Sequence, residues 1–244
     1  MALGMACGGR RCSLSPTASR HRRQKGPLMD YGKARTAMVE SQVRPADVTD
    51  PMLVSALRAV PRELFAPAKT RAVAYADAEL DIGGGRYLLR PRHLAKLLQA
   101  LEPRSGERAI ELAGGAGYGA AVLASCGLSV LVLESSAAHV ASARQALEAA
   151  GCGEVGVAST DLSAGWPAGA PYDVMLLNGA AEIIPEAWLA QLGEGGRLGA
   201  IVRNGPAGQA RIYRKERGVV SFRVVFDASP PTLPELVAPR PFAF

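Results

Sequence analysis

Residues 107–124 constrain the fold of this chain more than any other stretch of its 244 residues. They begin with a short apolar segment, continue through glycines at 114, 115, 117 and 119, and end in alanine, valine and leucine. This order predicts a buried strand, a tight turn and the first turns of a helix. A strand that ends in small residues lets a ligand lie against its backbone, and the following helix offers unpaired N–H groups at its positive end. We therefore expect a ligand to bind where this strand meets its helix.

A second apolar strand is expected over residues 128–134, and its last residue is Glu134. A carboxylate at the end of such a strand can accept hydrogen bonds from both hydroxyls of a ribose. The glycine-rich turn and Glu134 together predict a cofactor that contains a nucleoside. The glycine pattern alone is also compatible with close packing of a helix on a strand, and with Glu134 it is compatible with a dinucleotide dehydrogenase.

The rest of the chain alternates between apolar strands and amphipathic helices, which predicts βαβ units and a doubly wound parallel sheet. We expect strands at 108–113, 128–134, 154–159, 172–178 and 197–203, with helices at 117–126, 136–150 and 185–192. Residues 209–215 and 219–226 then flank a charged turn with a glycine, which predicts a final antiparallel hairpin. Asn178-Gly179 follows an expected strand, where a turn is the ordinary interpretation and a ligand contact from Asn178 is the alternative.

The beginning of the chain has a different character from this alternating part. The net charge is +6, but six basic residues and no acid lie in residues 1–28, so the remainder has 22 bases and 22 acids. This balance does not indicate a nucleic-acid-binding face, and no run of 18 apolar residues indicates a membrane span. We expect residues 1–28 to be a disordered basic tail or an incorrectly assigned start, although their composition also resembles a transit peptide.

Residues 29–106 are expected to form accessory helices and a segment that covers the cofactor and substrate, and residues 107–244 the core domain. Asp50-Pro51 is a helix start signal, because proline is favoured at the first helical position. Residues 74–91 contain several glycines and are expected to be irregular. The four cysteines form no CxxC pair and lie at no ligand spacing from the three histidines, so no metal is expected.

Three features favour S-adenosylmethionine over a dinucleotide. The sheet is expected to end in an antiparallel hairpin rather than in further βα units. Asp161 follows the third strand, where it can accept a hydrogen bond from an adenine amino group. Gly195-Gly-Arg-Leu198 begins a late strand after a turn.

An ordered set of motifs resembles the protein-L-isoaspartate O-methyltransferases and runs from about residue 38 to about residue 202. The matching stretches are Val60-Pro-Arg-Glu-Leu-Phe-Ala-Pro67, Ala74-Tyr-Ala-Asp77, Ile82-Gly83, Glu111-Leu-Ala-Gly-Gly-Ala-Gly-Tyr118, Gly165-Trp-Pro167, Ala170-Pro-Tyr-Asp173 and Gly195-Gly-Arg-Leu198. The set in this order is far more specific than any one of its members.

The resemblance implies an α/β, Rossmann-like class I methyltransferase fold, with a seven-stranded, mostly parallel sheet, a C-terminal antiparallel hairpin and N-terminal accessory helices. It implies a cytoplasmic enzyme that uses S-adenosylmethionine to methylate protein or peptide carboxylates, L-isoaspartyl residues in protein repair, with no nucleic-acid or membrane partner. The oligomeric state stays open. The resemblance places the cofactor contacts at Ala113, Gly114, Gly115, Gly117, Glu134, Asp161 and Leu162.

The chain departs from the family in the segment that the resemblance assigns to substrate. The family carries Gly-Gln-Thr-Ile-Ser-Gln-Pro there, and this chain carries Gly85-Arg-Tyr-Leu-Leu-Arg-Pro91. Tyr87 takes the threonine position, and Leu89, which cannot donate a hydrogen bond, takes the serine position, so no catalytic residue is assigned. The predicted substrate contacts are Arg86, Tyr87, Leu88 and Leu89.

The two arginines of this segment, Arg86 and Arg90, can attract an acidic substrate, although Arg90 can also be a solvated charge. Ala113 replaces the first glycine of the cofactor loop, which is tolerable if that backbone needs no positive φ. These departures leave two alternatives to isoaspartate repair: a relative that methylates another acceptor, and a binding module without catalysis. A nicotinamide dehydrogenase is a further alternative.

Overall fold

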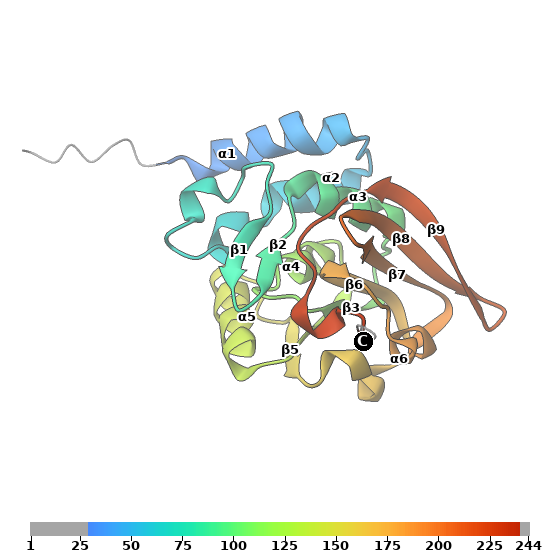
Figure 1. Ribbon diagram of the computed structural model, residues 1–244. Helices are drawn as coiled ribbons and strands as arrows, with labels where there is room; N and C mark the ends of the chain where they lie inside the picture. Colours follow the sequence, from blue (N-terminus) through green and yellow to red (C-terminus); the bar gives the residue numbers. More distant parts are fainter. Residues whose placement is uncertain (1–28, 240–244) are drawn as a thin grey trace, which may run out of the picture.

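The computed structural model describes residues 29–239, so the predicted tail at 1–28 lies outside the described residues. A seven-stranded sheet has the order β5-β4-β3-β6-β7-β8-β9 (Figure 1). Its first five strands in this order are parallel and its last two are antiparallel to their neighbours. This confirms the predicted doubly wound sheet with a final hairpin.

The strands agree with the predicted positions and differ mainly at their ends. They are β3 (Arg108–Leu112), β4 (Ser129–Glu134), β5 (Gly156–Ser159), β6 (Tyr172–Ala181), β7 (Leu192–Asn204), β8 (Ala207–Glu216) and β9 (Val219–Asp227). The intervening helices are α4 (Tyr118–Ser125), α5 (Ala137–Ala149) and α6 (Glu186–Ala190). The order of strands brings the carboxyl ends of β3, β4, β5 and β6 to one edge, where ligands bind in open parallel sheets.

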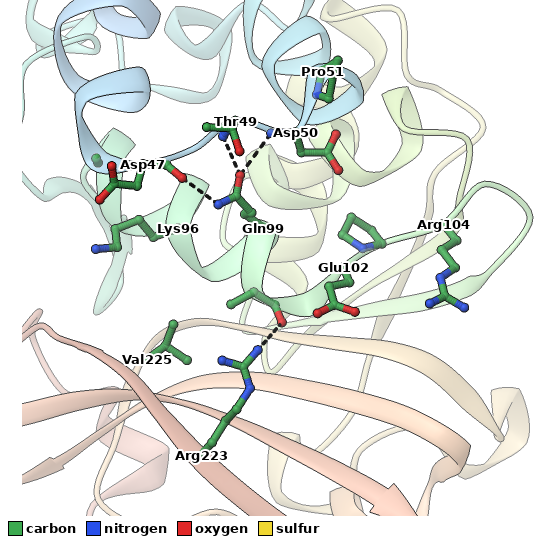
Figure 2. A pocket seen from close by; sticks show the side chains of 13 residues that line it. Asp47, Thr49, Asp50, Pro51, Lys96, Gln99, Glu102, Arg104, Arg223 and Val225 are labelled. Carbon is green, nitrogen blue, oxygen red and sulfur yellow. Dashed lines mark hydrogen bonds between the residues drawn. The ribbon is translucent and has the colours of Figure 1, made fainter.

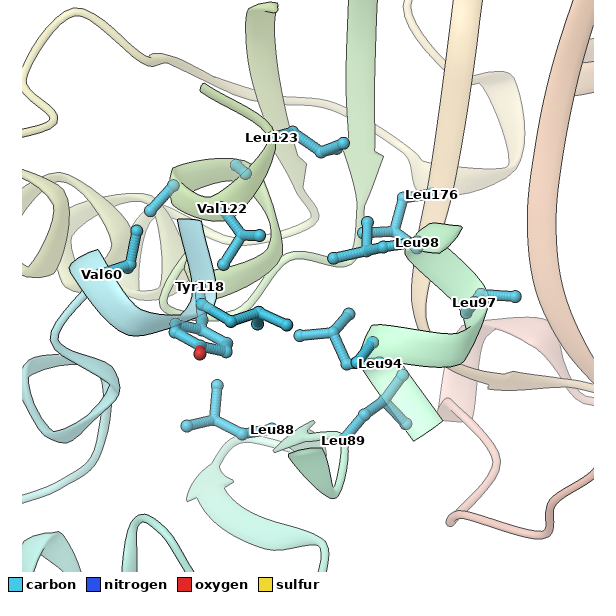
Figure 3. Close-up of a cluster of buried hydrophobic side chains, with 14 of the residues drawn as sticks. Val60, Leu88, Leu89, Leu94, Leu97, Leu98, Tyr118, Val122, Leu123 and Leu176 are labelled. Atoms are coloured by element: carbon cyan, nitrogen blue, oxygen red, sulfur yellow. The ribbon is translucent and has the colours of Figure 1, made fainter. Parts of the chain in front are cut away.

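Both faces of the sheet are buried. Along β6, Val174 and Leu176 belong to one apolar cluster, while Met175 and Leu177 belong to the other. Successive side chains of a strand point to opposite faces, so both faces must be covered when every position is apolar. The first cluster includes Leu88 and Tyr118 beside the helices (Figure 3), and the second includes Trp188 of α6.

The N-terminal region supplies three helices that lie near one another in Figure 1: α1 (Tyr31–Met38), α2 (Pro51–Ala59) and α3 (Pro91–Leu101). The Asp50 side chain accepts a hydrogen bond from the Leu53 N–H at 3.0 Å, which confirms the predicted start of α2. Among residues 29–239, no helix is both long and apolar enough to cross a lipid bilayer.

Two local predictions were wrong. The segment predicted to be irregular contains an antiparallel hairpin, β1 (Leu80–Gly83) with β2 (Arg86–Leu88). Asn178 and Gly179 do not form a turn, because β6 continues through them to Ala181. Gly179 has a φ of 141°, and a Cβ there would lie only 2.9 Å from Leu233. The glycine therefore permits close contact with a later segment of the chain.

Candidate cofactor site

Three residues of the turn between β3 and α4 have a left-handed backbone conformation. Ala113, Gly115 and Gly117 have φ values of 52°, 61° and 85°. The sequence suggested that alanine is tolerable at position 113 if the backbone there needs no positive φ. Since φ is positive, Ala113 is strained where a glycine would not be. Ala113 is fully buried, and its N–H donates to the Leu133 carbonyl at 3.0 Å, so the sheet holds the strained conformation in place.

Glu111 lies beneath this turn and explains why it is so rich in glycine. The side chain is fully buried, and its Oε2 accepts a hydrogen bond from the Ala120 N–H at 2.8 Å. A Cβ at Gly114 would lie 2.9 Å from Glu111 Oε2, and one at Gly119 would collide with Oε1. Burial raises the pKa of Glu111 to about 8, with the nearby Glu134 charge adding to the effect, so the carboxyl is mostly protonated at neutral pH.

Glu134 ends β4, and its carboxylate is fully buried. Oε1 accepts from the Gly115 N–H at 2.5 Å, so the predicted ribose acid is in direct contact with the glycine-rich turn. Oε2 accepts from the Ser135 N–H at 3.1 Å and lies 3.4 Å from His139 Nδ1. The structure therefore brings the two sequence features that predicted a nucleoside cofactor, the turn and the acid, into one site.

Arg86 reaches the same carboxylate from β2. Its Nε lies 3.1 Å from each oxygen of Glu134, and its Nη2 lies 3.0 Å from Oε2. The same guanidinium also binds Glu235, at 3.1 Å from Nη1 and 2.8 Å from Nη2. Arg86 is fully buried between the two acids. The two carboxylates provide hydrogen-bond acceptors and opposite charge for the buried guanidinium. Arg86 is therefore held in this position by residues of the chain itself.

Glu235 lies in a single helical turn, η7 (Pro234–Leu236), near the end of the described chain. Burial raises its pKa, but hydrogen bonds from Arg86 and Ser135 outweigh that effect and lower it to about 2. The Ser135 hydroxyl donates to Glu235 at 2.8 Å and accepts from Arg86 at 2.9 Å. Glu235 is therefore ionised throughout the physiological range.

Arg90 also binds an acid of the chain. It donates to both oxygens of Glu79, at 2.7 and 2.6 Å. Arg86 is held by Glu134 and Glu235. Both guanidinium groups are therefore already paired with acids of the chain itself. The geometry gives no support to the hypothesis that these arginines attract an acidic substrate, which stays a prediction.

The predicted adenine contacts lie at the neighbouring strand end. Asp161 is exposed and accepts from the Ser163 N–H and hydroxyl, both at 2.9 Å, capping the turn η5 (Leu162–Ala164). Leu162 is buried, and its carbonyl accepts from Trp188 Nε1 at 2.6 Å. The Thr160 N–H donates to the Glu134 carbonyl at 3.0 Å. Glu134, at the end of β4, and Asp161, just after β5, therefore lie at the ends of two adjacent strands. Their roles toward a cofactor stay predictions.

The predicted substrate segment is mostly buried. Leu88 and Leu89 lie in the apolar cluster with Tyr118 and Leu94 (Figure 3), while Tyr87 is half-buried. The Leu89 carbonyl accepts from Arg62 Nη2 at 2.7 Å. Since neither leucine carries a polar side-chain atom, the chain supplies no hydroxyl at the family's serine position.

Asn178 connects this segment to the glycine-rich turn. Its Nδ2 donates to the Tyr87 carbonyl at 3.2 Å and to the Gly114 carbonyl at 3.3 Å. These bonds give Asn178 a positioning role in this arrangement, and the alternative that Asn178 contacts a ligand directly stays a prediction. Asn178 is one of three residues whose part in the site the sequence did not specify, with Glu111 and Glu235. Glu111 had a local signal, because an acid inside an apolar strand needs a compensating contact.

A large surface hollow lies elsewhere in the molecule. It has a volume of about 730 Å³ and lies among the segment before α2, the end of α3, and β9 (Figure 2). Charged and polar side chains such as Lys96, Gln99 and Arg223 line it, and Gln99 accepts from the Thr49 and Asp50 N–H groups. None of the predicted cofactor or substrate residues is in its lining. The hollow is therefore separate from the site at the strand ends.

The residues at the strand ends fit a nucleoside cofactor in their chemistry. The buried acid at the end of β4, the left-handed glycine turn and the Asp161 turn are the groups that such a cofactor needs, although Arg86 already uses Glu134 as an acceptor. The sheet order and the final antiparallel strands, together with this site, define a class I methyltransferase fold.

Comparisons with known proteins give the family. The model of the protein-L-isoaspartate(D-aspartate) O-methyltransferase family matches residues 33–228. A protein-L-isoaspartate O-methyltransferase of Methylorubrum extorquens is 41% identical over 191 residues, which cover 78% of this chain and 82% of the relative. A second such protein, from Rhodopseudomonas palustris strain HaA2, is 38% identical over 185 residues, 76% of each chain. The chain belongs to the protein-L-isoaspartate O-methyltransferase family.

Solved structures agree on the fold. A protein-L-isoaspartate O-methyltransferase structure matches with a TM-score of 0.70 at 24% identity, over 82% of this chain and 64% of the other. A structure from Plasmodium falciparum in complex with S-adenosyl-L-homocysteine, described as a protein-L-isoaspartate O-methyltransferase, matches with a TM-score of 0.71 at 15% identity. It is matched over 85% of this chain and 100% of its own length.

Proposed function

We propose that this chain is an S-adenosylmethionine-dependent O-methyltransferase that methylates protein carboxylates, with L-isoaspartyl residues as its substrate and protein repair as its role. The observation that carries the proposal is the contact between the glycine-rich turn and the strand-end acid, Gly115 N–H to Glu134 at 2.5 Å, within a chain of this family. The cytoplasm is the proposed location, and the free thiols of Cys126 and Cys152 support it.

In this proposal Glu134 accepts hydrogen bonds from the ribose, and Asp161 with Leu162 holds the adenine. Residues 113–117 approach the cofactor through their backbone, since Gly114, Gly115 and Gly117 carry no side chain there. The substrate lies against the segment that contains Arg86, Tyr87, Leu88 and Leu89. Asn178 keeps that segment and the turn at a fixed separation through its two carbonyl contacts.

The proposed reaction needs no general base from the chain. A carboxylate acceptor is already ionised at neutral pH. S-adenosylmethionine, when bound, supplies a methyl group on a positively charged sulfur. The chain contributes by excluding water and by holding the acceptor in line, which are the effects that favour a reaction between opposite charges. Leu88, Leu89 and Tyr118 belong to the buried apolar cluster next to this segment, and in the proposal this apolar surrounding helps to exclude water.

A second candidate function is methylation of a different carboxylate or of a small molecule. It rests on Leu89, which removes the hydroxyl at the family's serine position, and on Tyr87, which replaces the small threonine hydroxyl with a phenol at the end of a large ring. The loss leaves the chemistry possible but removes groups that would bind the isoaspartyl carboxylate. A binding protein without catalysis has less support, because Glu134 and the turn keep their direct contact.

The test is transfer of labelled methyl groups from S-adenosylmethionine to two peptides that differ only in an isoaspartyl or a normal aspartyl residue. The proposal predicts labelling of the isoaspartyl peptide alone, as a base-labile ester. Labelling of neither peptide, by a protein that binds S-adenosylmethionine, would reject isoaspartate repair and favour another acceptor. Absence of S-adenosylmethionine binding would reject the methyltransferase altogether.

A further inference from the structure

The end of the described chain folds back over the strand ends that form the site. Leu233 N–H donates to the Ala180 carbonyl at 2.8 Å, and Glu182 N–H donates to the Leu236 carbonyl at 2.8 Å. Leu233 and Leu236 are buried, and the turn η7 contacts η5, which holds the predicted adenine residue Leu162. Residues 232–237 thus lie directly beside the proposed nucleoside site, held by backbone bonds to Ala180 of β6 and to Glu182 just after it, and by two buried leucines.

This segment also holds the hairpin that carries Arg86. Glu235 binds Arg86 through both oxygens, and a Cβ on Gly85 would lie 3.1 Å from Pro234. Gly85 has a φ of 75°, so glycine at this position serves both the left-handed turn and the close approach. Arg86 is therefore fixed from two sides, by Glu134 below and by Glu235 on the C-terminal segment.

Arg86 uses the acceptor positions that a ribose would need. An ionised carboxylate has about four lone-pair sites. Gly115 N–H takes one on Oε1 and Ser135 N–H takes one on Oε2, while Arg86 donates to both oxygens with Nε and Nη2. Two ribose hydroxyls can donate hydrogen bonds to Glu134 only if Arg86 moves away.

We propose that Arg86 and the C-terminal segment 232–237 form an internal lock on the cofactor site, in which Arg86 competes with the ribose for Glu134 and Glu235 holds Arg86 in place. The inference rests on the proposed function, since it needs a ribose-containing cofactor. The observed affinity equals the affinity of the open site multiplied by the fraction of molecules in which Arg86 has left Glu134. Movement of residues 232–237 accompanies cofactor binding, because Glu235 must release or follow the arginine.

The experiment compares S-adenosylmethionine affinity, measured by calorimetry, in wild type, R86M and E235Q. The matched controls are R90M and E79Q, which make the same changes in the neighbouring ion pair that does not contact Glu134. We expect R86M and E235Q to bind about tenfold more tightly than wild type, the order expected when a charge-assisted hydrogen bond no longer competes. R90M and E79Q should bind like wild type.

A second readout follows the movement itself. Trp188 lies in the same apolar cluster as Leu236 and donates to the Leu162 carbonyl, so its fluorescence reports on this region. In stopped-flow mixing with S-adenosylmethionine, the observed rate of wild type should reach a plateau set by lock opening, and E235Q should raise that plateau. If R86M does not fold, the affinity and the plateau of E235Q decide the question.

Three outcomes overturn the lock. Weaker binding by R86M would mean that Arg86 holds the cofactor rather than competing with it. Wild-type affinity in both R86M and E235Q would reject the lock while leaving the proposed function intact. Failure of every folded variant and of wild type to bind S-adenosylmethionine would reject the lock and the proposed function together.

Discussion

Replacement of Glu111 by glutamine should change how the stability of the protein depends on pH. Glu111 is fully buried and its pKa is raised from 4.5 to about 8, mainly by burial. Because the folded-state pKa lies above the unfolded value, the folded chain binds more protons than the unfolded chain between these two values. The contribution of Glu111 is therefore fully present below pH 4.5 and is lost as the pH rises through 8.

The size of the effect follows from the two pKa values. Between pH 5 and pH 8, proton linkage through this one group should remove about 3–4 kcal/mol of folding stability. The E111Q variant cannot ionise, and its amide oxygen can still accept from the Ala120 N–H. Its stability relative to wild type should therefore rise by about 3–4 kcal/mol across the same interval.

The assay is urea unfolding of wild type and E111Q at pH 5, 6, 7 and 8. Other titrating groups cancel in the difference between the two proteins, so the slope of that difference isolates Glu111. If the stability difference between the two proteins stays the same at all four pH values, Glu111 ionises with an ordinary pKa. That result would refute the claim that burial raises the pKa of this carboxyl. E107Q is the matched control, since Glu107 is partly exposed and its pKa is lowered rather than raised.

Three further changes test other parts of the site. A113G should stabilise the protein by about 0.5–1 kcal/mol, because glycine relieves the positive φ but increases the entropy of the unfolded chain; a lower urea midpoint would contradict the strain. Y87T/L89S should increase methylation of an isoaspartyl peptide if those positions set specificity, while the loss of buried Leu89 lowers stability by about 2–4 kcal/mol; transfer that does not increase in the folded variant would count against that role. W188F should cost about 2–3 kcal/mol, because it removes the bond to the Leu162 carbonyl and leaves a cavity at a fully buried position, measured as a lower urea midpoint with an unchanged m-value.

The alternating core could be predicted from the sequence because its signal is local and repeated. Each strand of β3, β4 and β6 is a short apolar run followed by a helix, and each ends near a glycine or an acid. These patterns give the strand positions and the edge at which Glu134 and the turn meet. The positive φ of Ala113 could not be predicted from the sequence, because an alanine within a glycine-rich turn does not indicate which backbone conformation it adopts.

The parts that the sequence did not predict depend on distant contacts. Glu235 and Arg86 are separated by 149 positions, and nothing local to either residue indicates the pairing. Asn178-Gly179 carries an ordinary turn signal, but β6 continues past it because Ala180 and Ala181 pair with β7, and Ala180 also forms a bridge with Thr232. The same C-terminal segment takes part in both contacts. Its sequence of prolines, small residues and isolated apolar residues gives little indication of where it folds.

Binding of labelled S-adenosylmethionine by equilibrium dialysis, with wild type and E134Q compared at equal protein concentration, tests the central claim most directly. The claim is that the acid at the end of β4 and the turn beside it form the cofactor site of a methyltransferase. We predict saturable binding by wild type and an affinity about tenfold lower in E134Q, because a neutral amide accepts hydrogen bonds more weakly than a carboxylate. No binding by wild type, or equal binding by both folded proteins, would contradict the claim.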